Sequence, residues 1–248
     1  MIPASMASLF RLVLHEACPL CGAHLGVPGG ETCCLSCQND LPLIRSPLCI
    51  RCGIPFPSPE GEDHICGTCL LDPPPFSKAR SLGRYEGPLH DAIHRFKYRR
   101  MIPLGEALGK FMGNLSMPGI SWTAFDVVVP VPLHERKLRA RGFNQSAVLA
   151  KALGRVAALP LDVFSFRKIR ETRPQTFLSA EERVKNVRRA FEVVNPAAVE
   201  GKRILLVDDV FTTGSTVREG VRELLRGGAA DVAVLTAARA VPRFMGGS

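Results

Sequence analysis

The chain has 248 residues, of which 46% are hydrophobic and 22% are charged, and its formal net charge is +9. This composition excludes a disordered chain, and the absence of an apolar run of about 18 residues argues against a membrane span. Residues 1–75 carry three basic and seven acidic side chains, a charge of −4, which leaves +13 for the rest. The uneven charge favours two domains, the second facing an anionic ligand, a nucleic acid or both.

The first 17 residues contain an apolar segment, Leu9 to Leu14, that Arg11 interrupts. They lack the basic start and the small-residue cleavage site of a signal peptide. We therefore expect residues 1–17 to form a helix docked on the body, and we expect a cytoplasmic protein.

All nine cysteines lie between positions 18 and 69, and eight of them form four Cys-x-x-Cys pairs. Such a pair can turn both sulfurs onto one tetrahedral ion, and a second pair completes the site. The spacing predicts a double zinc ribbon over residues 18–72 with structural Zn²⁺, in one or two sites, and leaves sequential and interleaved pairing open. Disulfides suit a secreted module better, and a redox Cys-x-x-Cys normally stands alone. The predicted ligands are Cys18, Cys21, Cys34, Cys37, Cys49, Cys52, Cys66 and Cys69.

Residues 72–75 (Asp-Pro-Pro-Pro) are typical of a stiff linker, and we expect the second domain over residues 76–242. There, strand patterns alternate with helical patterns, which predicts an α/β domain with a parallel sheet and flanking helices. We expect strands at 81–85, 125–129, 163–167, 191–194, 203–207 and 232–237, the last one closing the sheet. Helices are expected at 87–97, 102–115, 143–158, 181–189 and around 217–225, with loops at 133–142 and 168–180.

The predicted loop at 133–142 is basic and follows a buried strand that ends in Pro130-Val131-Pro132. Arg136, Lys137, Arg139 and Arg141 could neutralise an anionic leaving group at the carboxyl edge of the sheet. A solvated run of charges is the alternative.

The most informative segment runs from Leu205 to Thr216. A buried strand leads into two carboxylates, Asp208 and Asp209, and then into a hydroxyl-rich turn and a helix. Helix N-termini bind phosphate, while carboxylates suit sugar hydroxyls or Mg²⁺ with its waters. The sequence thus predicts a phosphorylated-ribose site; an ordinary strand–turn–helix with one capping residue is the alternative. The phosphate-binding residues would be Thr212, Thr213, Gly214, Ser215 and Thr216.

This segment resembles the loop of type I phosphoribosyltransferases that binds PRPP (5-phosphoribosyl-1-pyrophosphate). Together with residues 129–134, 141–145 and 172–178, behind paired Cys-x-x-Cys motifs, it makes the chain similar to the competence protein F (ComF) family. The resemblance implies a type I phosphoribosyltransferase-like sheet behind a Cys₄ zinc ribbon. It also implies a closing loop at 169–183, in which Arg173 and Gln175 would contact the ligand, and a link to incoming single-stranded DNA.

The sequence is compatible with two functions. The first is a phosphoribosyltransferase that uses PRPP with Mg²⁺, with Asp208 and Asp209 as the catalytic pair and an unknown acceptor. The second is a non-catalytic module that senses PRPP or a nucleotide, or handles single-stranded DNA, with the ribbons docking a DNA-processing protein. One Trp and two Tyr argue against strong DNA binding by ring stacking.

Overall fold

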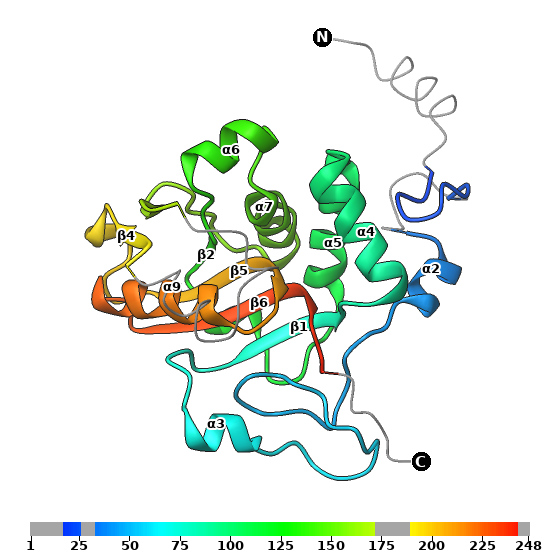
Figure 1. Cartoon of the computed structure of the whole chain (residues 1–248), viewed down its shortest axis with the longest axis horizontal. Coiled ribbons are helices and arrows are strands. Elements are labelled where there is room, and N and C mark those ends of the chain that lie inside the picture. The colour runs from blue at the N-terminus through cyan, green and yellow to red at the C-terminus, as the bar shows by residue number, and fades with distance from the viewer. Residues whose placement is uncertain (1–16, 26–32, 172–188, 243–248) are drawn as a thin grey trace.

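The computed structural model describes residues 17–25, 33–171 and 189–242. Its centre is a four-stranded parallel sheet with the order β1-β6-β5-β2 (Figure 1). Two short 3₁₀ helices, η1 (Trp122–Ala124) and η3 (Pro196–Ala198), lie in connections. The strands are β1 (Ala79–Arg84), β2 (Val127–Pro130), β3 (Phe166–Lys168), β4 (Phe191–Val193), β5 (Arg203–Phe211) and β6 (Asp231–Arg239). The helices are α2 (Leu35–Asp40), α3 (Gly67–Leu71), α4 (Gly87–Tyr98), α5 (Ile102–Asn114), α6 (Glu135–Arg141), α7 (Gln145–Ala157) and α9 (Ser215–Arg226).

Strand β5 explains how the sheet is covered on both faces. Leu205 and Val207 point into a core formed with α4, α5 and α7, whereas Ile204 and Leu206 point into a second core with α9. Successive side chains of a strand alternate between faces, so a run of four apolar residues requires cover on both sides. Figure 1 shows α4, α5 and α7 on one side of the sheet and α9 and α3 on the other.

The predicted parallel α/β domain is confirmed, with three differences. The strands expected at 163–167 and 191–194 form a separate antiparallel pair, β3–β4, with Phe166 opposite Val193. Strand β6 lies between β1 and β5 and is not an edge. The segment 133–142, expected as a loop, contains helix α6, which His134 caps by accepting from the Arg136 amide and Gly142 ends in the left-handed region. Charged residues predominate in this helix, and no apolar stripe marks it in the sequence.

The ribbon region has two halves, one with the first four paired cysteines and one with the last four, and they pack against different parts of the molecule. Cys49, Cys52 and Cys69 belong to the same buried core as β5 and α9, and the Ala79 amide donates to the Arg51 carbonyl at 2.7 Å. The first half instead contacts α4, where Arg95 donates to the carbonyls of Pro19 and Leu20. The second half therefore packs into the core of the α/β domain, whereas the first half packs on α4.

Some predictions lie outside the described residues: the N-terminal helix at 1–17 except its last residue, the helix at 181–189 except its last residue, and most of the loop at 168–180. In the part of the chain that the structure describes, no helix is long and apolar enough to cross a membrane.

Candidate functional site

A cavity of about 250 Å³ opens at the carboxyl edge of the sheet, where β5 and β2 end. Ligands of open α/β sheets bind at this edge. The cavity has an acidic wall from β5, hydroxyl groups from the turn before α9, and a basic wall from two other segments, α6 and β3. Its lining residues are Lys97, Val131, Pro132, Leu133, Lys137, Arg141, Gln145, Ser146, Lys168, Asp208, Asp209, Val210, Thr212 and Thr216.

Asp208 and Asp209 form the acidic wall, and they lie inside β5, which continues to Phe211. Asp208 Oδ1 accepts hydrogen bonds from Ser146 Oγ at 2.8 Å and from the Asp209 amide at 2.9 Å. Burial, followed by repulsion from Asp209, raises the pKa of Asp208 to about 7. These two adjacent carboxylates therefore form a site where a cation or a hydroxyl donor is strongly favoured.

Lys97, at the end of α4, closes the acidic wall with an ion pair whose Nζ lies 2.8 Å from Asp209 Oδ2. Burial alone would lower the pKa of Lys97, but the charge of Asp209 outweighs it and the pKa is raised. Only the fold brings Lys97 onto Asp209, across 112 positions of the chain (209 minus 97).

The segment predicted to bind phosphate connects β5 to α9. Gly214 takes φ +77 as the N-cap of α9, a conformation that glycine adopts without strain. Thr213 and Ser215 share a hydrogen bond between their hydroxyls at 2.9 Å. Thr212 and Thr216 line the cavity. The helix N-terminus therefore points its dipole at the same cavity as the two carboxylates.

The basic wall consists of Arg141 and Lys137 from α6 and Lys168 from β3. Burial, and then the charge of Lys137, lowers the pKa of Lys168 to about 8. Three cations gathered in one partly buried wall favour the binding of an anion.

Arg141 and Lys137 were predicted from the sequence as cations of this edge, whereas Lys168 was not. A lone lysine beside a short strand carries no signal in the sequence. Arg136 and Arg139 lie on α6 with exposed side chains paired to Glu171 and Glu135, and they are not among the lining residues. Arg173 and Gln175 lie outside the described residues.

The segment before α7 holds the Val131–Leu133 wall of the cavity in place. Asn144 caps α7 by accepting from the Ser146 amide at 3.0 Å, and its Nδ2 donates to the Val131 carbonyl at 3.1 Å. Arg141 donates to Gln145 Oε1 at 2.6 Å. The segment 141–145 thus joins the basic wall to the acidic one through Ser146.

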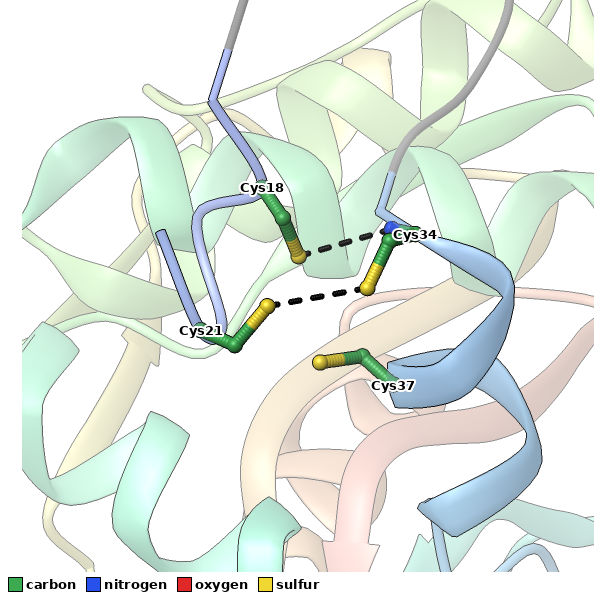
Figure 2. Close-up of side chains that lie close together, drawn as sticks. All are labelled: Cys18, Cys21, Cys34 and Cys37. Carbon is green, nitrogen blue, oxygen red and sulfur yellow. Dashed lines mark hydrogen bonds between the residues drawn. The ribbon is translucent and has the colours of Figure 1, made fainter. Parts of the chain in front are cut away.

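Eight cysteines form two tetrads, Cys18/Cys21/Cys34/Cys37 and Cys49/Cys52/Cys66/Cys69, so the pairs combine in sequential order. Figure 2 shows the four sulfurs of the first tetrad converging on one point. The Cys21–Cys34 and Cys52–Cys66 sulfurs lie 3.6 and 3.8 Å apart.

A tetrahedral Zn²⁺ with Zn–S bonds of about 2.3 Å requires sulfurs about 3.8 Å apart. Backbone amides also donate to the sulfurs, as from Cys66 to Cys49 at 3.3 Å. None of the eight forms a disulfide. Both tetrads therefore fit structural Zn²⁺.

Comparison with known proteins agrees with this geometry. A family model described as a double zinc ribbon domain matches residues 9–70, and one described as a phosphoribosyl transferase domain matches residues 143–241. Fold and site define a phosphoribosyltransferase-type domain joined to a double zinc ribbon.

The chain is 36% identical to DNA utilization protein YhgH of Escherichia coli K12 over 220 residues, covering 87% of this chain and 91% of that protein. It is 28% identical to competence protein F of Haemophilus influenzae, covering 84% and 96%, and 29% identical to competence protein ComFC of Bacillus subtilis, covering 84% and 85%. The chain belongs to the ComF family, in which these proteins fall.

Proposed function

We propose that the chain binds PRPP with Mg²⁺ in the cavity and transfers its phosphoribosyl group to an acceptor. The observation that carries the proposal is the layout of one cavity of about 250 Å³. A phosphate loop, two carboxylates and three cations face each other there. A 5′-phosphate suits the α9 N-terminus, ribose hydroxyls suit Asp208 and Asp209, and a pyrophosphate suits Lys137, Arg141 and Lys168.

In this reaction the acceptor forms a bond to C1 of the ribose while the bond from C1 to the pyrophosphate oxygen breaks. The electron pair of that bond leaves with the pyrophosphate, so negative charge grows on the leaving group. Lysine and arginine side chains already aimed at that position stabilise the charge without reorganising. Bound Mg²⁺ would add further charge neutralisation, with Asp208 and Asp209 as its protein carboxylates, directly or through water.

A thermal-shift titration tests the binding step. PRPP with Mg²⁺ should raise the melting temperature of the wild-type protein, because a ligand that binds only the folded state stabilises it. The Asp208→Asn, Asp209→Asn double variant should lose the shift. If that variant bound PRPP with wild-type affinity, Asp208 and Asp209 would not be the groups that bind the ribose.

Helix α6 offers a matched comparison for the basic wall. Arg141→Gln should weaken PRPP binding, whereas Arg139→Gln should leave it nearly unchanged, because Arg139 is exposed and paired with Glu135. Equal losses in both variants would show a general charge effect and no defined pyrophosphate site. Release of pyrophosphate in the presence of amines and bases then identifies an acceptor.

A second function, the handling of single-stranded DNA, is favoured by a row of rings beside the cavity. The row begins at Tyr85, just before α4, and continues along α4 through His90, His94 and Tyr98, with ring centroids 4.8, 6.2 and 4.6 Å apart in that order. Arg141 lies over the ring of Tyr98 at 5.8 Å. Both tyrosines of the chain are therefore gathered at one place, which their small number did not indicate. The +13 charge of residues 76–248 and the names of the relatives point the same way.

Single-stranded DNA should then bind with an affinity that falls steeply with salt. Tyr98→Ala should weaken it by about 1–3 kcal/mol if a base stacks there. Phe164→Ala is the matched control, since Phe164 is also highly exposed but lies outside the row. Absence of DNA binding at low salt would leave the PRPP proposal intact and would favour the ribbons as a docking site for a DNA-processing protein.

A further inference from the structure

One buried arginine, Arg239, connects the second cysteine tetrad to the phosphate loop. It is the last residue of β6 and is only 6% exposed. Its Nη1 donates to the Cys52 carbonyl at 2.8 Å, and its Nη2 lies 3.7 Å from Cys52 Sγ. The flat face of the same guanidinium lies on the ring of Phe211, with Cζ 4.2 Å from the ring centroid. Arg239 thus contacts a predicted zinc ligand with its edge and an aromatic ring with its face.

Phe211 carries this contact into the phosphate loop. It is the last residue of β5, paired with Arg239 in the sheet, and it is 4% exposed. Its ring lies directly against Gly214, where an added Cβ would come within 2.6 Å of the ring. The ring therefore supports the backbone of the loop at the point where the chain turns into α9.

The charge of the second tetrad explains why a buried arginine is tolerated here. Four thiolates around one Zn²⁺ carry a net charge of −2. All four cysteines of this tetrad act on Arg239 electrostatically, and among the described residues no carboxylate pairs with it. A guanidinium is costly to bury without an anion, so the loaded tetrad is the natural counter-ion of Arg239.

A second connection runs in parallel on the outer side of α9. Arg218 contacts Asp72, with Nη1 2.9 Å from Oδ2 and Nη2 donating to the Asp72 carbonyl at 2.8 Å. Asp72 ends α3, the helix that contains Cys69, and the Arg218 amide donates to the Gly214 carbonyl at 2.8 Å. The second tetrad is therefore tied to the first turn of α9 from two sides.

We propose that Arg239 is a positioning residue and that zinc in the second tetrad, acting through Arg239 and Phe211, holds the phosphate loop in its binding conformation. The first tetrad contacts α4 and lacks this connection among the described residues. The part that concerns PRPP rests on the function proposed above. The coupling between metal and loop does not.

Arg239→Met in the full-length zinc-loaded protein is the main test, with Arg80→Met as the matched control. Arg80 is equally buried at 6% exposure and holds the same ribbon, since Nη1 and Nη2 each donate to the Ile50 carbonyl at 3.2 Å. Arg80 has no described contact with Phe211 or Gly214. Arg239→Lys keeps the charge but loses the flat face and the forked donors, so it separates charge from shape.

Three readouts follow each variant: zinc release to a chelator, amide hydrogen exchange of residues 205–216, and binding of PRPP with Mg²⁺. Arg239→Met should release one zinc about 10- to 100-fold faster, as expected for loss of a group that supports a metal ligand. It should also speed exchange in the loop and weaken PRPP about tenfold. Arg80→Met should alter zinc release without changing loop exchange or PRPP binding, and Arg239→Lys should fall between wild type and Arg239→Met.

The proposal would be overturned if residues 205–216 of Arg239→Met exchanged their amide hydrogens at the wild-type rate. It would also be overturned if Arg80→Met accelerated this exchange as much as Arg239→Met does. If Arg239→Met does not fold, the same readouts are taken on Arg239→Lys, and wild-type behaviour in that variant overturns it. Failure of the wild-type protein to bind PRPP would refute the proposed function instead, because the exchange comparison still decides whether the tetrad holds the loop.

Discussion

Without ligand and at neutral pH, the Asp208→Asn variant should be more stable than the wild-type protein. The same substitution should abolish the binding of PRPP with Mg²⁺. The substitution keeps the shape of the side chain, and the amide oxygen can still accept from Ser146 Oγ and from the Asp209 amide. It removes a buried negative charge that lies beside a second carboxylate. Burial and the neighbouring Asp209 both disfavour the charged form of Asp208, and the variant relieves this unfavourable electrostatic energy.

The pKa of Asp208 sets the size and the sign of the effect. Burial and the neighbouring Asp209 raise this pKa to about 7 in the folded protein, against about 3.9 in an unfolded chain. The stability that the protonated group contributes is complete below pH ~4 and is lost as pH rises to about 7. The slope reaches about 1.4 kcal/mol per pH unit, which amounts to about 2 kcal/mol between pH 5.5 and 7.

Urea unfolding of wild type and variant at pH 5.5, 6.5 and 7.5, without ligand and with zinc present, measures this difference. The advantage of Asp208→Asn should grow by about 2 kcal/mol across the range. Asp126→Asn is the control, because hydrogen bonds from Arg203 hold the pKa of Asp126 far below this range. Its effect should therefore not change with pH. A constant difference between wild type and Asp208→Asn, or a variant less stable at pH 7.5, would refute the reasoning.

Three further predictions concern other parts of the molecule. Metal analysis of the purified protein should find two Zn²⁺ per chain, because both tetrads have zinc geometry; four disulfides by mass spectrometry would contradict this. Gly214→Ala should cost about 1–2 kcal/mol in urea unfolding through its positive φ alone and should also weaken PRPP binding; unchanged values would show that the loop adapts. Affinity for PRPP should fall as pH rises through about 8, where Lys168 loses its charge, and Lys168→Arg should keep its affinity to higher pH; parallel pH profiles would remove Lys168 from the site.

Features carried by consecutive residues were predictable from the sequence. The segment from Leu205 to Thr216 contains its strand, its carboxylates and its helix start in one stretch, so local rules of burial and capping suffice. The Cys-x-x-Cys pairs predicted their tetrads in the same way, although the spacing left the pairing open. Helix α6 was missed because its residues carry no apolar periodicity. It contributes Lys137 and Arg141 to the cavity, and these two residues are distant in sequence from the phosphate loop.

The sequence by itself determined the class of fold, the strand–turn–helix from Leu205 to Thr216 and the Cys-x-x-Cys pairs, because each depends on residues a few positions apart. Only the tertiary structure decided what meets at these sites. Lys97 reaches Asp209, Lys168 joins the basic wall, and Arg239 joins the second tetrad to Phe211 because the packing of helices and strands brings segments that are distant in sequence into contact. Such long-range contacts depend on strand order and register, which no local pattern specifies.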